Sequence, residues 1–220
     1  MAALVWDATG SRFYENGVNH GVLYPMADNG TYGTGVAWNG LTGVTESPDG
    51  AEANDLWADN IKYATMRSTE TFGGTITAYT YPDEFMQCDG SANLADGVYI
   101  GQQKRKGFGL CYRTEIGNDT PTDTDDGYKL HLVYGATASP SERDYETIND
   151  SPDAIEFSWE FDTTPVNVAG YKPTSLITID STKADATKLA NLEKILYGDT
   201  NTEPRLPLPD ELFGINGIFA

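Results

Sequence analysis

The chain has 220 residues and carries 14 Lys and Arg against 33 Asp and Glu, a formal net charge of −19. This charge argues against a protein that binds the outside of nucleic acid by neutralising phosphates, because that mode needs a basic surface. A hydrophobic content of 39%, with four Trp, 13 Tyr and eight Phe, excludes a disordered chain, and the length suits a single folded domain spanning residues 1–220.

The chain begins with a segment that we expect to be an extended N-terminal arm, residues 1–33, because glycines are spread through it. A β-core with long loops, residues 34–182, follows and opens with a predicted strand over Thr34–Thr45. The polar connection Glu46–Asn60 is too long for a simple hairpin. Segments of this kind usually pack on the same subunit or on a neighbour.

A hairpin is predicted next, with strands Ile61–Thr71 and Thr75–Tyr81. Phe72, Gly73 and Gly74 lie between them, and glycines supply the positive φ angles of a tight turn. The polar stretch Asp83–Gly97 after this hairpin is a second long loop.

Period-two alternation defines the central strands. Phe108–Tyr112 and Lys129–Tyr134 each alternate large apolar residues with others, which places Leu130 and Leu132 in the core and His131 on the solvent side. The long polar segments Gly117–Gly127 and Gly135–Pro152 follow these two strands.

The clearest alternation covers Ile155–Asp162, where every second residue is a large apolar one and the others are polar or acidic. One face of this strand is therefore predicted to be core and the other acidic. Its acidic positions are Glu156, Glu160 and Asp162. A further strand is expected over Thr174–Asp180.

One α-helix is predicted over residues 183–197, where Leu189, Leu192 and Leu196 fall on a single apolar stripe. Thr182 suits the N-cap, and Gly198 suits the end of the helix. Residues 198–220 are expected to form an extended C-terminal arm punctuated by prolines. The predicted fold class is mainly β, an antiparallel β-sandwich or barrel with one packed helix.

The sequence shows no signature of a catalytic or metal site. It contains neither a nucleophile elbow nor a phosphate-binding loop nor a zinc-protease motif, and two histidines and two cysteines form no metal-binding pattern. The acidic stretch Asp119–Gly127 fails the spacing of a calcium-binding EF-hand loop and is expected to be a solvated loop, with an irregular cation site left open. A carboxylate pair for glycoside hydrolysis also stays open. We therefore expect no catalytic residues, no metal, no cofactor and no enzymatic activity.

Lys104, Arg105 and Lys106 form the only concentrated basic run. It suits either rim charge near a strand turn or an interface that meets the acidic face of another subunit. The N-terminal residues lack a signal peptide, and the chain contains no apolar run long enough to cross a membrane, so a soluble protein without membrane contact is expected.

Several segments together resemble the major tail tube proteins of long-tailed, non-contractile (siphovirus-type) bacteriophages, particularly those of Gram-positive hosts. The similarity lies in their order and joint presence, since none is a catalytic signature. The segments are Arg12–Tyr24 (RFYENGVNHGVLY), Gly35–Leu41 (GVAWNGL), Ala58–Ala64 (ADNIKYA), Phe72–Gly90 (FGGTITAYTYPDEFMQCDG), Phe108–Asp119 (FGLCYRTEIGND), Lys129–Gly135 (KLHLVYG) and Ala138–Val166.

The resemblance implies hexameric rings that stack into a tube, with inner sheets joined into a β-barrel around a lumen through which genomic DNA passes without specific binding. It also implies contacts with tape-measure, tail-tip (distal tail) and tail terminator proteins, and a location in the virion, with the host cytoplasm during assembly. The predicted hairpin is the candidate for closing the barrel between subunits. Its residues are Tyr63, Thr65, Thr71, Phe72, Gly73, Gly74, Thr75, Thr77 and Tyr79.

The acidic positions Glu156, Glu160 and Asp162 are candidates for the lumen or for an interface, where a negative wall would repel DNA phosphates. Two alternatives stay open. One is the tube ring of a contractile injection machine. The other is a carbohydrate-binding β-sandwich, for which Trp38 and Trp57 are the candidate sugar contacts.

Overall fold

The computed structural model describes residues 3–120, 127–148, 150, 153–215 and 217–219. The protein is mainly β, with 44% strand and 12% helix, and its sheets are antiparallel, in agreement with a β-sandwich. The elements are, in order, β1 (Phe13–Pro25), β2 (Val36–Ala37), β3 (Leu41–Asp49), β4 (Ala53–Ala58), β5 (Ile61–Arg67), β6 (Thr71–Ala78), η1 (Asp83–Phe85), α1 (Met86–Asp89), β7 (Ala92–Ala95), β8 (Val98–Ile100), β9 (Phe108–Asn118), β10 (Tyr128–Ala138), β11 (Phe157–Thr163), β12 (Leu176–Asp180), α2 (Ala186–Tyr197) and α3 (Pro209–Phe213).

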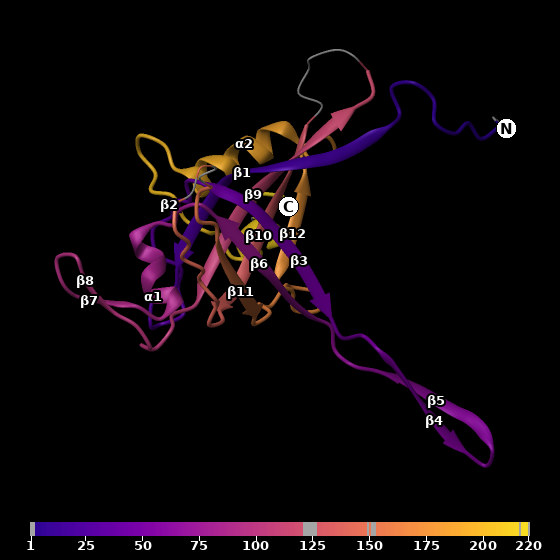
Figure 1. Ribbon diagram of the computed structural model, residues 1–220. Helices are drawn as coiled ribbons and strands as arrows, with labels where there is room; N and C mark the ends of the chain where they lie inside the picture. Colours follow the sequence, from indigo (N-terminus) through magenta and orange to yellow (C-terminus); the bar gives the residue numbers. More distant parts are fainter. Residues whose placement is uncertain (1–2, 121–126, 149, 151–152, 216, 220) are drawn as a thin grey trace.

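The body is built around one sheet in the order β2-β1-β9-β10-β11-β6-β3 (Figure 1). One edge of β10 pairs with β9. Along its other edge, the first half of β10 pairs with β12 and its last residues pair with β11. The sheet curls back on itself, since Leu41 of β3 lies against Gly21 of β1.

Two apolar cores lie on opposite faces of the central strands. The first is enclosed by the curled sheet and by η1 and α1, and its largest members are Trp38, Phe85, Phe108, Trp159 and Phe161. The second lies between β1, β9, β10 and β12 on one side and α2 with the C-terminal segment on the other, and it contains Tyr24, Leu130, Tyr134, Leu192 and Leu212. The central strands β9 and β10 are therefore buried on both faces.

This arrangement confirms the inward direction of Leu130 and Leu132 but makes the prediction for His131 wrong. The His131 ring is buried, with 8% of its surface exposed, because it stacks on Tyr112 of the neighbouring strand β9 and contacts Glu46 of β3. Alternation marks a solvent face only when one side of a sheet is uncovered.

The hairpin predicted through Gly73 and Gly74 is wrong. Both glycines lie inside the continuous strand β6, opposite Asp162 and Phe161 of β11 and opposite Ser47 and Glu46 of β3. A Cβ on Gly74 would lie 2.4 Å from the Thr45 carbonyl oxygen and 2.8 Å from the Phe161 ring. Glycine is therefore required here by close packing.

The chain turns instead at Asp59 and Asn60, both with positive φ, between β4 and β5. This is the backbone required by a two-residue hairpin turn, and Asn and Asp tolerate it. The polar loop predicted over Glu46–Asn60 is thus the end of β3, all of β4 and the turn. Residues 50–70 form a two-stranded arm that leaves the body (Figure 1).

The helix prediction is confirmed, with a later start. α2 begins at Ala186, and its N-cap is Asp185, whose carboxylate accepts hydrogen bonds from the backbone N–H groups of Thr187 and Lys188. Thr182 donates its hydroxyl to Asp180 at 2.6 Å, so the predicted cap serves the turn before the helix. Gly198 follows the helix with φ of 78°.

The terminal segments differ from the predicted arms. Phe13–Pro25, which the N-terminal arm included, forms β1 and pairs with β9 inside the main sheet, so the arm prediction is wrong for these residues. The C-terminal residues pack on their own body through buried Leu206 and Leu212, and α3 interrupts them. Residues 3–12 precede β1 without regular structure.

Candidate functional site

The acidic face predicted from alternation lies on the solvent side of β11. Glu160 and Asp162 are exposed, as is Glu156 just before the strand, while Trp159 and Phe161 point into the first core. Among the described residues, none of the three carboxylates forms an ion pair.

Neighbouring strands extend this face with hydroxyl groups. Thr75 of β6 is opposite Glu160, and Thr77 is opposite Ser158. Thr42 of β3 donates its hydroxyl to Glu156 and lies 3.0 Å from the Thr77 hydroxyl. The outer surface of β3, β6 and β11, which we call the acidic face, thus combines carboxylates with Thr and Ser hydroxyls.

The nine residues predicted for a barrel-closing hairpin fall in two places. Tyr63 and Thr65 belong to β5 in the arm, far out from the body. The other members lie in β6 or just after it, where Phe72 contacts Phe161 in the first core. The structure therefore separates this candidate set and unites Thr75 and Thr77 with the acidic face.

The arm is amphipathic, and its strand register shows how. Asp55 is opposite Thr65 and accepts its hydroxyl at 2.7 Å, and the same carboxylate lies 2.8 Å from the Lys62 ammonium. The alternate pairs place mainly apolar residues on the other face, because paired residues share a face. These pairs are Asn54 with Met66 and Leu56 with Ala64; the register then shifts, so that Trp57 is opposite Lys62 and Ala58 opposite Ile61 beside the turn.

The arm exposes large apolar side chains to solvent. Trp57 is 69% exposed, Ile61 62% and Tyr63 73%. A two-stranded ribbon of this kind is marginal on its own in water, and contiguous exposed apolar surface marks sites of interaction. The sequence pattern does not reveal the arm, because it predicts a loop for one half and, for the other half, a hairpin strand with the wrong partner.

The basic run lies beside η1 and α1. Lys104 is exposed, and Lys106 is 3.6 Å from the Asp28 carboxylate and donates its backbone N–H to Gln87. The Arg105 side chain lies close to Gly90. Burial raises the pKa of Asp89, and the charges of Arg143 and then of Arg105 oppose this rise. The run is thus partly engaged with its own subunit.

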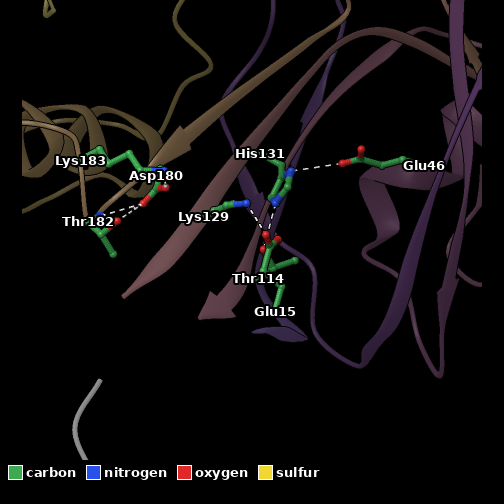
Figure 2. Close-up of polar contacts among 8 residues, drawn as sticks. All are labelled: Glu15, Glu46, Thr114, Lys129, His131, Asp180, Thr182 and Lys183. Atoms are coloured by element: carbon green, nitrogen blue, oxygen red, sulfur yellow. Dashed lines mark hydrogen bonds and ion pairs between the residues drawn. The ribbon is translucent and has the colours of Figure 1, made fainter. Parts of the chain in front are cut away.

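A polar cluster at the base of the arm connects β3 with the body (Figure 2). The His131 ring stacks on Tyr112 with centroids 4.6 Å apart, and its Nδ1 lies 3.2 Å from a Glu46 carboxylate oxygen. Its Nε2 is 3.0 Å from the Thr114 hydroxyl, and Tyr112 donates its hydroxyl to Glu46. Glu46, Tyr112, His131 and Thr114 form what we call the hinge cluster.

Contact with His131, and next with the Tyr112 hydroxyl, lowers the pKa of Glu46, although partial burial raises it. Burial, followed by the nearby Glu46 carboxylate, raises the pKa of Tyr112. The cluster joins a carboxylate, an imidazole and a hydroxyl, but these groups lie between packed strands. Its geometry suits the anchoring of β3 to β9 and β10.

Other contacts in Figure 2 hold neighbouring segments. Lys129 of β10 pairs with Glu15 of β1. Asp180 accepts hydrogen bonds from Thr182 and lies 2.8 Å from Lys183, and these contacts, the Lys183 bond first, lower the pKa of Asp180 to about 2. These contacts fix the entry into α2.

Features that would suggest other chemistry are limited in the described part of the chain. It contains no group of three or more metal-binding side chains, and no helix long and apolar enough to cross a membrane. Most of the acidic stretch considered for calcium, residues 121–126, lies outside the described residues. Cys88 and Cys111 are free and buried, and burial raises the pKa of each thiol to about 12.

The two tryptophans considered for carbohydrate binding lie far apart in the fold. Trp38 is buried in the first core and donates its indole N–H to the Thr80 carbonyl at 3.0 Å, so its ring is not available to a sugar. Trp57 is exposed on the arm. No model of a known protein family matches the sequence, and a comparison with curated proteins finds no match.

Proposed function

We propose that the protein is the building block of a bacteriophage tail tube, a structural protein without enzymatic activity that assembles into stacked hexameric rings. The observation that carries this proposal is the amphipathic arm of residues 50–70, which leaves the body and exposes an apolar face. A chain that acted alone would keep an unfavourable surface in water. An assembling chain buries that surface on a neighbour.

The reach of the arm supports assembly. From Asp49 to the turn at Asp59, ten residues at about 3.3 Å each span roughly 30 Å. A compact chain of this length has a radius of gyration of about 17 Å. The arm is therefore long enough to cross much of an adjacent copy. Residues Leu4, Val5 and Trp6 are also exposed and offer a second segment for contacts between subunits.

The acidic face suits the lumen of such a tube. Glu156, Glu160 and Asp162 have no cationic partners among the described residues, so DNA phosphates would meet a repulsive wall and pass without binding. The chain carries −19 in total, which makes passage of DNA more plausible than its capture. Tape-measure, tail-tip and tail terminator proteins are the partners that the family resemblance implies.

The tube ring of a contractile injection machine would use the same arm and face, and it remains the second candidate. Against a carbohydrate-binding module stands the burial of Trp38, one of the two tryptophans expected to contact a sugar.

Negative-stain electron microscopy across a concentration series tests the proposal. We expect hollow tubes or stacked six-fold rings, formed either by the purified protein or after addition of tail-tip and tape-measure proteins. Monomers that persist with those proteins present would contradict the proposal. In that case glycan binding through Trp57 becomes the next measurement.

A further inference from the structure

A pocket of about 330 Å³ lies between the helical segment η1–α1 and the β7–β8 hairpin (Figure 1). This volume is at the lower end of the range for small-molecule pockets, about 300–1,000 Å³. None of its lining residues belongs to the acidic face, the hinge cluster or the arm. The pocket is therefore a separate feature of the surface.

The chain's own contacts fix the walls of this pocket. Phe85 and Cys88 are buried in the first core and hold the helical segment in place. Gly90 ends α1 with φ of 84°, and the next residue, Ser91, donates its backbone N–H to the Met86 carbonyl at 2.8 Å. The pocket is thus formed before any ligand arrives, which lowers the cost of binding.

The two walls bring polar groups and an aromatic ring together. Asp83, Met86 and Gln87 line the pocket, and their spacing of three and four places them on one side of the helical segment. On the hairpin, Asn93 is the register partner of Tyr99, so the amide and the ring project from the same face. A ligand between the walls meets a ring with an amide beside it, and a carboxylate and a second amide across from it.

The polar side chains of the pocket are available to a ligand. Those of Asp83, Gln87, Ser91 and Asn93 form no hydrogen bond with any group in the described part of the chain. The two amides and the hydroxyl both donate and accept, and the carboxylate accepts. A neutral molecule with several hydroxyl groups matches this set, while the half-exposed ring of Tyr99 offers an apolar surface to its C–H groups.

The charge of the pocket disfavours other classes of ligand. Asp83 lines it, and the next residue, Glu84, is exposed, so phosphates and carboxylates are repelled. A metal ion would need more ligands than one carboxylate, and the described residues contain no group of three metal-binding side chains.

From these groups and this charge, we propose that the pocket binds one ring of a neutral sugar. Tyr99 stacks on the C–H face of the ring, and Asp83, Gln87 and Asn93 bond to its hydroxyls. The site is distinct from Trp38 and Trp57, and the inference goes beyond tube assembly and does not depend on it.

Saturation-transfer NMR on the purified full chain tests the proposal. The probes are glucose, galactose, N-acetylglucosamine and their methyl glycosides, with choline and inorganic phosphate as charged comparators. We expect transfer to at least one sugar, with a Kd on the order of 1 mM, as for a small ligand held by few contacts. A methyl glycoside that binds like its free sugar indicates the end of a glycan chain as the natural ligand, whereas binding of the free sugar alone indicates a monosaccharide.

Two variants then locate the site. Tyr99→Ala and Asn93→Ala should each weaken sugar binding about tenfold, because each removes one contact. The matched control is Tyr171→Ala, since Tyr171 is 81% exposed and does not line the pocket, and its affinity should equal that of wild type. Circular dichroism checks that the variants fold.

Four results would overturn the inference. They are transfer to no sugar, transfer only to choline or phosphate, wild-type affinity in both pocket variants, and loss of binding in Trp57→Ala instead, which would move the contact to the arm. Electron microscopy decides assembly separately, so a failure of sugar binding leaves the proposed function standing.

Discussion

The hinge cluster shows how few polar residues connect the arm to the body. Glu46 is the member that belongs to β3, and Tyr112 and His131 belong to β9 and β10. Tyr112 is buried, so its hydroxyl needs a partner, and Glu46 supplies it. In Glu46→Gln the amide oxygen can still accept the Tyr112 hydroxyl, but the negative charge 3.2 Å from the buried His131 ring is lost.

Glu46→Gln should therefore lower the free energy of unfolding by about 1 kcal/mol near neutral pH. The pKa of Glu46 is lowered in the folded state, so its contribution is present above the unfolded carboxyl pKa and is lost as the pH falls through the folded pKa. The difference between wild type and variant should shrink below about pH 4.

Urea unfolding at a series of pH values measures this difference. Glu52→Gln is the control, since Glu52 is exposed on the arm, and we expect no pH-dependent difference for it. A Glu46 variant as stable as wild type at pH 7 would show that the charge of Glu46 contributes nothing to folding.

His131 shows what the sequence could not predict at this scale. Its alternation with Leu130 and Leu132 gave the correct direction of both leucines. The sequence cannot reveal that the opposite face is also covered, because the covering strand comes from a distant part of the chain. The contacts of His131 with Glu46 and Tyr112 depend on that tertiary packing.

At the scale of elements, β6 depends on a glycine that sequence reasoning assigned to a turn. Gly74→Ala should destabilise the protein by about 1–3 kcal/mol, because the new methyl group would lie 2.4 Å from the Thr45 carbonyl oxygen and 2.8 Å from the Phe161 ring. Thermal unfolding measures the effect. Gly101→Ala, which has open space around it, should change the midpoint little. Equal effects of the two changes would argue against close approach at Gly74.

The start of α2 gives a second prediction. Asp185→Ala should cost about 1 kcal/mol, because two backbone N–H groups lose their acceptor. Thr182→Ala removes only the hydroxyl contact with Asp180 and should cost less. Chemical denaturation of the two variants compares them. A larger loss at Thr182 would place the cap where the sequence first suggested it.

Strand and helix identities followed well from period and composition, while their connections did not. β11 and α2 were predictable because each has one apolar and one polar face. β4 was missed and β5 was predicted with the wrong partner, because the turn Asp59–Asn60 has no glycine, whereas the glycines of β6 resemble those of a turn. A glycine indicates a turn only where close packing does not also require a glycine.

At the scale of the whole molecule, the mainly β fold was predictable and the projecting arm was not. Replacing residues 50–70 by Asn-Gly, which joins Asp49 and Thr71 through a short turn, should leave a folded monomer and abolish assembly. Circular dichroism and light scattering measure the two outcomes. A control that changes only Asp59–Asn60 to Asn-Gly keeps the arm and should still assemble. Assembly of the shortened chain would remove the arm from the proposed function.

The acidic face gives the last prediction, because its role depends on where it lies in the assembly. Glu160→Lys/Asp162→Lys reverses two charges on β11 without touching either core. If the face lines a lumen, tubes should still form, but labelled DNA should be retained in them in low salt and released as salt rises.

The matched control is Asp96→Lys/Asp144→Lys, at exposed positions outside the acidic face, and it should retain less DNA. Equal retention by both variants would mean that general surface charge, and not a lumen, governs the contact. Loss of tubes only in the β11 variant would instead place this face between subunits, where two lysines would meet the neighbour and break the contact that the acids make.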